Sequence, residues 1–372
     1  MAISSFYNYK ILNFKKKKYK NIILTWGRRN NFKETYYYDS FLSLRSDQSK
    51  NSLFFVISLD HNIPSIIPDN VVLFCKIKKD RSILFLFSEI LKCFIHNNFN
   101  FLKIAHYLSS QTIFAKMVNK QIFRIFKLCS FEKIILPYEG QPFQNYLLNN
   151  FKKKTSVKTL GIVHSVIPAL PLNFMKREGS PDKLYISGKQ QKNVLTNHFG
   201  WKNSEIHMTE SLRLKKKLDQ KIIGSIFLPI NLSKSKLVVN IFTNFLIDFK
   251  NKLLPVLKVR NHPQMINSHR HIKLETNLNK ILKNNKKKFN YKTKLKVCLF
   301  IGTTSAMIEF VEKKVNVYHI PINKEIDIYS NKIWKKIKYK EKKNVFMYNK
   351  LKNGNLVNLS NKKYSLKKIN II

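Results

Sequence analysis

A short turn after an apolar segment of the sequence carries hydroxyl groups where a phosphate could bind. The run VCLFI at 297–301 has the length of a buried parallel strand and ends at Gly302. Thr303, Thr304 and Ser305 follow, and each of these residue types can cap a helix. The next residues have helical spacing and lead into another apolar run, which predicts a strand–turn–helix–strand unit. Free N–H groups at the positive end of such a helix suit a phosphate.

Glu309 lies one helical turn beyond this motif. A carboxylate there could accept a hydrogen bond from a ribose hydroxyl. The alternative interpretation is an ordinary βαβ unit in which the hydroxyl residues only cap the helix.

A second candidate is the stretch PVLKVRNHP at 255–263. Its alternating residues predict a strand with Lys258 and Arg260 on one face, which runs directly into His262 and Pro263. Ligands of open parallel sheets bind beyond the carboxyl ends of the strands. A His-Pro has little packing reason to follow a basic strand, so we predict that His262 and the hydroxyl turn meet one anion.

Two titratable residues follow predicted strands in the first half of the chain. The strand KIILPYEG ends in Glu139 and Gly140, and the strand KTLGIVHSV ends in His164. Either side chain could titrate usefully once it is partly buried. The alternatives are an exposed turn carboxylate for Glu139 and a merely hydrogen-bonded strand histidine for His164.

Alternating strands and helices place the chain in the α/β class with mostly parallel sheets. A charged stretch at 215–220 is a candidate hinge, and we predict domains at 1–213 and 218–345, followed by a basic tail at 346–372 of undefined structure. The predicted strands are 21–27, 52–60, 70–77, 133–140, 158–166, 182–188, 222–229, 255–260, 297–301 and 315–320. The predicted helices are 82–97, 101–130 (one or two), 142–154, 189–199, 234–252, 306–314 and 333–343, whereas 29–50 and 267–293 read as irregular.

The composition limits the class of protein. With 372 residues, 44% hydrophobic residues, 28 Phe and 16 Tyr, the chain can bury a core in each of two domains. Its 69 Lys and Arg against 21 Asp and Glu give a formal charge of +48, which ordinarily suggests nucleic acid or an anionic surface. The lysines are dispersed, however, and the abundance of Lys, Asn, Ile and Phe is typical of an adenine/thymine-rich genome. Contact with acidic lipid headgroups is compatible with this charge.

The cysteines and the N-terminus exclude other classes. Cys75, Cys93, Cys129 and Cys298 lie far apart in apolar contexts, so neither a zinc site nor a disulfide framework is expected. The N-terminal residues lack the apolar core of a signal peptide, and no apolar stretch is long enough to span a membrane. We therefore expect a cytoplasmic protein, either free or peripheral to the inner face of the membrane.

These motifs together resemble GT-B glycosyltransferases. The His-Pro at 262–263 and the Thr-Ser turn are similar to elements of sialyltransferase-like, capsule and glycerophosphate-polymer transferases. The segments NIILTWG, YYYDSFLSL, YEGQPFQNYL, GIVHS and PDKLYISGKQQKNVLTNHFGW resemble bacterial surface carbohydrate biosynthesis proteins of capsule or lipopolysaccharide pathways. The resemblance covers residues 20–325. It implies two Rossmann-like domains facing a cleft, an N-terminal one for the acceptor and a C-terminal one for the nucleotide sugar.

The resemblance also implies roles for the candidate residues. A donor nucleotide and its phosphates would contact a set of residues in the second half: Lys258, Arg260, His262, Gly302, Thr303, Thr304, Ser305 and Glu309. Glu139 is the first choice for a catalytic base and His164 the second. The better-studied families carry an acidic pair before a glycine, and this chain lacks an obvious one. No DxD motif is present either, so we expect neither a metal ion nor a cofactor.

The expected reaction transfers a sugar, with a lean toward a CMP-linked donor, to a surface glycan or lipid-linked acceptor. One alternative is a GT-B-like sugar-nucleotide epimerase or hydrolase. Another is a basic nucleic-acid-binding protein, although no RNP-like strand, helix-turn-helix or zinc module is visible, and we expect no nucleic-acid partner.

Overall fold

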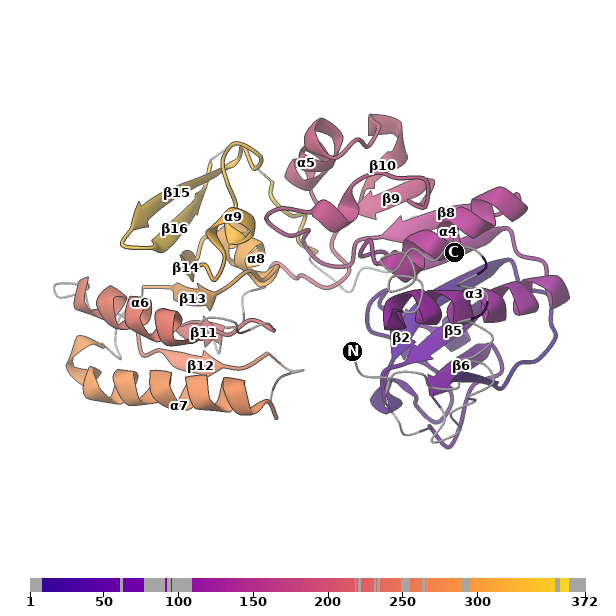
Figure 1. Ribbon diagram of the computed structural model, residues 1–372, viewed down its shortest axis with the longest axis horizontal. Coiled ribbons are helices and arrows are strands. Elements are labelled where there is room, and N and C mark those ends of the chain that lie inside the picture. Colours follow the sequence, from indigo (N-terminus) through magenta and orange to yellow (C-terminus); the bar gives the residue numbers. More distant parts are fainter. Residues whose placement is uncertain are drawn as a thin grey trace.

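The computed structural model describes residues 9–60, 63–76, 109–217, 222–230, 235–248, 255–262, 267–289, 295–351 and 355–360, together with isolated residues 91, 95, 219, 232 and 265. Figure 1 shows two sheet-containing halves joined by a connecting segment. The predicted α/β class with two largely parallel sheets is confirmed by the strand pairing. Within the described residues, no helix combines the length and apolarity that crossing a bilayer requires.

The first half contains an eight-stranded sheet in the order β1-β6-β5-β2-β7-β8-β9-β10. Only β1 is antiparallel to its neighbour. The strands are β1 (Tyr9–Leu12), β2 (Asn21–Gly27), β5 (Ser52–Ser58), β6 (Val71–Lys76), β7 (Lys133–Pro137), β8 (Lys158–Ile162), β9 (Lys183–Ile186) and β10 (Ile206–Met208). The central strands are apolar on both faces, and both faces are covered, as expected for a parallel sheet.

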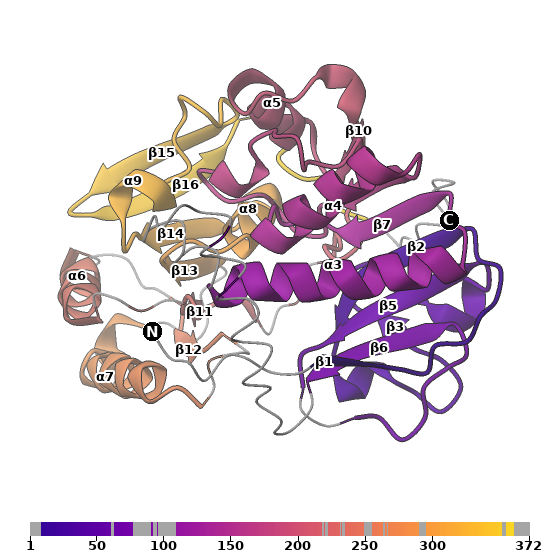
Figure 2. The same cartoon turned by 45° about the vertical axis from the view of Figure 1, so that its right-hand side comes forward.

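Helices α3 (Ser110–Leu128), α4 (Pro142–Lys154) and α5 (Lys189–His198) belong to this half. Figure 2 shows α3 lying across one face of the sheet with α4 beside it. The opposite face packs against residues 37–45, which include the short hairpin β3 (Tyr38–Asp39) and β4 (Leu44–Arg45). The predicted helix at 82–97 lies outside the described residues, apart from the isolated residues 91 and 95.

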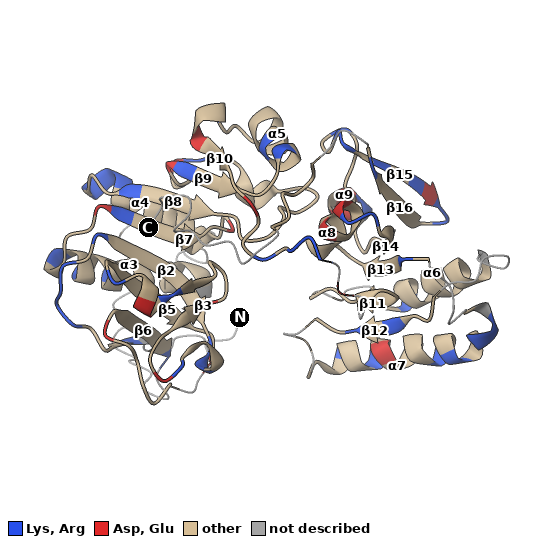
Figure 3. Cartoon of the chain, turned by 180° about the vertical axis from the view of Figure 1, so that it is seen from behind, with Lys and Arg blue, Asp and Glu red and all other residues tan. Residues whose placement is uncertain are grey.

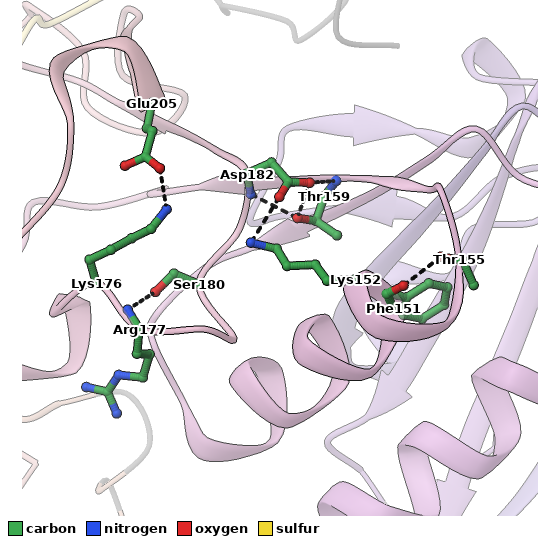
Figure 4. Close-up of polar contacts among 9 residues, drawn as sticks. All are labelled: Phe151, Lys152, Thr155, Thr159, Lys176, Arg177, Ser180, Asp182 and Glu205. Atoms are coloured by element: carbon green, nitrogen blue, oxygen red, sulfur yellow. Dashed lines mark hydrogen bonds and ion pairs between the residues drawn. The ribbon is translucent and has the colours of Figure 1, made fainter.

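The amino ends of two neighbouring strands are tied by one carboxylate. Asp182, just before β9, accepts from the Thr159 N–H and hydroxyl at 2.8 Å each, and its other oxygen accepts from Lys152 at 2.9 Å. Nearby, Lys176 pairs with Glu205 at 2.8 Å (Figure 4). The Asp182 contacts fix β8, β9 and the end of α4 relative to one another.

The second half contains a six-stranded sheet in the order β12-β11-β13-β14-β16-β15. The first four are parallel, and the last two form an antiparallel hairpin. The strands are β11 (Ser225–Phe227), β12 (Lys258–Arg260), β13 (Val297–Ile301), β14 (Asn316–Ile320), β15 (Ile337–Lys342) and β16 (Val345–Lys350). The helices are α6 (Ser235–Asp248), α7 (His269–Asn284), α8 (Ala306–Glu312) and α9 (Lys324–Asp327). Apolar residues of helices α6 and α7 belong to one hydrophobic cluster. Those of α8 belong to a second cluster, which also contains residues of the first half.

Two predictions for this half are wrong. Residues 333–343, predicted as a helix, contain β15, because Lys343 and Asn344 both have positive φ (48° and 64°) and close a two-residue hairpin to β16. The stretch 267–293, predicted as irregular, contains α7. This helix buries Leu274, Leu278 and Leu282, spaced four residues apart, along an otherwise polar surface.

The chain returns to the first half after β16. Residues 355–360, here called the return segment, exchange backbone hydrogen bonds with the first half: Asn358 N–H donates to Ser187 at 2.8 Å, and Ser211 N–H donates to Asn358 at 2.8 Å. Glu312 of α8 accepts from the Leu356 N–H at 2.8 Å. The second sheet runs to Lys350, so we propose that the C-terminal domain continues past residue 345 and that the return segment joins the two domains.

Candidate active site

The strand order of the first sheet marks where a ligand would bind. After β2 the chain adds β5 and β6 on one side of this strand. It then adds β7, β8, β9 and β10 on the other side. A doubly wound sheet binds ligands beyond the carboxyl ends of its strands at this switch point. Glu139 and Gly140 follow β7 there. Gly140 has φ +67°, and a Cβ at this position would lie 1.9 Å from the Asn173 carbonyl oxygen.

Glu139 is the accessible carboxylate of this switch point. Its side chain is 39% exposed, and its Oε2 accepts a 2.6 Å hydrogen bond from the Gln141 amide. Burial raises the pKa of Glu139, and the Gln141 hydrogen bond and the charge of Arg213 partly oppose that shift. A carboxylate with a raised pKa that still reaches solvent can accept a proton from a bound hydroxyl.

His164 lies directly beside Glu139, after the next strand, β8. Its Nε2 is 3.6 Å from Glu139 Oε1, and the Phe41 ring meets the imidazole edge-on at 5.0 Å. Burial, and secondarily the charge of Arg213, lowers the pKa of His164 to about 3, so the ring is neutral at pH 7. Its Nδ1 is buried without a hydrogen-bond partner. The two predicted base candidates are thus together, and Glu139 is the one that a substrate can reach.

Arg213 was not predicted as a site residue. It lies between β10 and β11, in the segment that connects the two halves. Figure 3 shows Lys and Arg, in blue, along this connecting segment. The Arg213 side chain is exposed, and its charge acts on both Glu139 and His164. The available sequence signal was an arginine just before the predicted hinge at residue 215.

The predicted hydroxyl turn lies at the switch point of the second sheet, between β11 and β13. Gly302 has φ +65°, and a Cβ there would lie 3.1 Å from Pro229 at the end of β11, so glycine suits the position. Thr303 Oγ1 donates to Asp327 at 2.6 Å. The other Asp327 oxygen accepts from the Ile322 and Asn323 N–H groups at 2.9 Å each. The Thr303 hydroxyl therefore holds the segment after β14.

The remaining residues of this motif are partly engaged within the protein. Thr304 and Ser305 are half-buried, and the Ser305 side chain makes no capping hydrogen bond. Glu309 forms an ion pair with Lys313 across one turn of α8, with both side chains mostly buried. Their contacts to a nucleotide stay predictions.

His262 follows the basic strand β12 at the same end of the second sheet as the hydroxyl turn, beyond the carboxyl ends of the strands. Strand β12 is the outermost strand, and Lys258 and Arg260 are exposed on it. Arg260 Nε donates to Ser225 Oγ at 2.6 Å, which directs this side chain toward the start of β11. Partial burial, and then His271, lowers the pKa of His262. Two strand spacings place His262 roughly 10 Å from Gly302 along the edge, so their joint contact with one phosphate stays a prediction.

Direct contacts join the loops that follow the two sheets. Trp334 Nε1 donates to the Ala169 carbonyl at 2.8 Å, and the Tyr329 hydroxyl donates to the Ile167 carbonyl at 3.5 Å. Ile167 and Ala169 lie in the loop that begins at His164, and Tyr329 follows Asp327 by two residues. The loops beyond the carboxyl ends of β8 and β14 therefore meet.

Two further observations concern metals and known proteins. Among the described residues, no group of three or more His, Cys, Asp or Glu side chains is placed to hold a metal ion. No protein-family model matches the chain, and no curated protein does.

Several solved structures are loosely similar. A glycosyltransferase from Rickettsia africae is 11% identical, with 80% of this chain and 78% of that chain covered and a TM-score of 0.35. A trehalose-6-phosphate structure from E. coli, bound with UDP-2-fluoro glucose, is 8% identical over 79% and 76% of the chains, with a TM-score of 0.37. An α,α-trehalose-phosphate synthase (UDP-forming) from Burkholderia vietnamiensis is 9% identical over 79% and 76%, with a TM-score of 0.35.

Proposed function

We propose that this protein is a glycosyltransferase that moves a sugar from a nucleotide-sugar donor to a hydroxyl group of a glycan or lipid-linked acceptor. The observation that carries the proposal is the meeting of the loops beyond the carboxyl ends of two parallel sheets. One loop begins with His164 beside Glu139, and the other is tied to the hydroxyl turn through Thr303. Two ligand sites of parallel sheets brought together suit a reaction between two substrates.

In this proposal Glu139 removes the proton from the acceptor hydroxyl. His164 stays neutral and limits the space around Glu139. The hydroxyl turn, with His262 and the cations of β12, binds the nucleotide phosphates and stabilises the leaving group. The chemistry requires a positioned base and donors aimed at the developing negative charge.

The donor nucleotide, the acceptor and a contact with the membrane are proposed on separate grounds. A CMP-linked donor, a surface-polysaccharide acceptor and peripheral membrane contact come from the resemblance of the His-Pro and Thr-Ser motifs and from the charge of +48. Because the sequence lacks a DxD motif, we expect transfer to continue in the presence of EDTA.

A panel of nucleotide sugars tests the proposal. Purified protein should release nucleotide and glycosylate an acceptor, and Glu139→Gln should lower kcat by at least a hundredfold while donor affinity is unchanged. Glu132→Gln is a matched control, because Glu132 is an exposed carboxylate at the opposite end of the same strand. If the donor is isomerised or hydrolysed and no sugar is transferred, the protein is an epimerase or a hydrolase and the proposal is wrong. Binding to oligonucleotides alone would replace it by the nucleic-acid one.

His262→Ala tests the donor side separately. The loss of a contact that tightens as the sugar–phosphate bond breaks should cost roughly 3 kcal/mol, on the order of a hundredfold in kcat. If His262→Ala leaves turnover and nucleotide binding unchanged, the nucleotide does not lie at β12.

A further inference from the structure

The turn at residues 211–214, here called the linker turn, is held rigidly beside the candidate active site. Ser211 Oγ accepts from the N–H groups of Arg213 at 3.3 Å and of Leu214 at 3.0 Å. Ser43 Oγ donates to the Leu212 carbonyl at 3.1 Å. The Leu214 carbonyl accepts from Ser360 of the return segment. The backbone that carries the exposed Arg213 side chain is therefore held by hydrogen bonds from three segments of the chain.

The same contacts place the linker turn near His164. Ser43 follows Phe41 by two residues, and the Phe41 ring lies against the His164 imidazole at 5.0 Å. Arg213 acts electrostatically on both His164 and Glu139. Among the described residues, no carboxylate forms an ion pair with Arg213. Its charge acts on Glu139, which is 39% exposed, and on His164, whose buried Nδ1 has no hydrogen-bond partner.

We propose that Arg213 binds an anionic oxygen group, a phosphate or a carboxylate, of the substrate that lies beside Glu139. Arginine presents a planar fork of donors that pairs with such groups through two parallel hydrogen bonds. His164 is neutral and adds no positive charge, so binding of the anion would depend on Arg213. The inference rests on the proposed function and adds a substrate class to it: a substrate with a negative charge next to the reacting hydroxyl or the leaving group.

The anion has two possible sources, and binding measurements separate them. It is either the phosphate of the nucleotide donor or an anionic substituent of the acceptor. Calorimetric titration of the full chain with inorganic pyrophosphate, UDP and CMP requires no turnover. A failure of sugar transfer therefore leaves this measurement interpretable, and a failure of anion binding leaves the transfer assay interpretable.

The variants are Arg213→Gln, Arg213→Lys and the control Lys217→Gln. Lys217 is an exposed cation on the same connecting segment, so its removal reports the general effect of one charge on a chain of +48. We expect Arg213→Gln to weaken pyrophosphate binding at least tenfold, Arg213→Lys to weaken it less, and Lys217→Gln to change it less than twofold. Thermal unfolding midpoints check that the exposed substitutions leave the fold intact.

The nucleotides then identify the source. A parallel loss of UDP or CMP affinity in Arg213→Gln assigns the anion to the donor, and unchanged nucleotide affinity with weakened pyrophosphate binding assigns it to the acceptor. The proposal is overturned if wild type binds none of the three probes, or if Arg213→Gln and Lys217→Gln weaken binding equally.

Discussion

Asp39 allows a quantitative test of how the loop above His164 is held. Its carboxyl group is fully buried, and one oxygen accepts from the N–H groups of Phe41 and Leu42 at 2.8 and 2.9 Å. Its second oxygen and the neighbouring Thr25 hydroxyl are both buried without a hydrogen-bond partner. The carboxyl group thus shapes the turn that carries Phe41 to His164, and it does so without a compensating cation.

The magnitude follows from the pKa of Asp39. Burial raises it from 3.8 to about 6, although the nearby Thr25 hydroxyl and the N–H groups of Leu42 and Phe41 oppose the shift. Between those values the folded state binds more protons than the unfolded state, so stability falls as pH rises from about 4 to 6. The difference corresponds to about 3 kcal/mol of stability lost at pH 7 relative to pH 3 from this group alone.

Asp39→Asn keeps the oxygen that accepts from the turn and removes the buried charge. Its amide can donate to the Thr25 hydroxyl. We expect equal stability of variant and wild type below pH 4 and a growing advantage of the variant up to pH 7, to at most about 3 kcal/mol. Asp39→Ala loses both accepted hydrogen bonds and should be less stable by about 1–3 kcal/mol in acid.

Urea unfolding between pH 3 and 7.5 measures these differences. Asp47→Asn is the matched control on the same loop, because Asp47 is a partly exposed carboxylate whose hydrogen bond to Arg45 lowers its pKa. It should show no gain between pH 5 and 7. A loss of more than 1 kcal/mol in Asp39→Asn at pH 7 would mean that the ionised carboxylate stabilises the turn, and the reasoning from burial would be refuted.

Three further substitutions test the scaffold. Partial burial tends to raise the pKa of Asp182, but the Thr159 and Lys152 donors lower it overall. The ionised carboxylate therefore stabilises the fold above its unfolded pKa near 4, and this stabilisation is lost in acid. Asp182→Ala should cost roughly 1–2 kcal/mol at pH 7 in urea unfolding and much less at pH 3. Trp334→Phe removes the indole donor between the two halves and should lower stability by about 2 kcal/mol, measured by calorimetry, with no change expected if that contact is dispensable. Lys314→Gly should raise the unfolding free energy by about 1 kcal/mol, because Lys314 directly follows the C-cap of α8 with φ 59° and glycine adopts that conformation without a steric cost; a lower stability would contradict this.

Most strands were predictable because a parallel sheet buries both faces of its strands. Runs such as NIILTWG and VCLFI are apolar throughout, and they became β2 and β13 with the expected bounds. Helix α7 was missed because its apolar residues form one narrow stripe among lysines and asparagines. The β15–β16 hairpin was missed because its turn, Lys343-Asn344, lacks the glycine that usually marks such a turn.

The candidate site was predictable to the extent that it depends on strand ends. Parallel neighbours end at one edge, and this is why Glu139 and His164, each predicted at the end of a strand, lie 3.6 Å apart. Arg213 could not be found in this way, because its position depends on Ser43 and Ser211, and no local pattern encodes those contacts. The engagement of Thr303 by Asp327 is equally a property of tertiary structure.

One carboxylate links the two candidate substrate sites. Asp327 accepts from the Thr303 hydroxyl in the turn of the second sheet and from two backbone N–H groups just before α9. Tyr329, two residues later, reaches the Ile167 carbonyl in the loop that begins at His164. A movement of the hydroxyl turn would therefore have to displace Tyr329 or break the Thr303 hydrogen bond. Since sugar transfer depends on holding both substrates at a fixed separation, this short chain of contacts supplies the positional constraint that the proposed reaction requires.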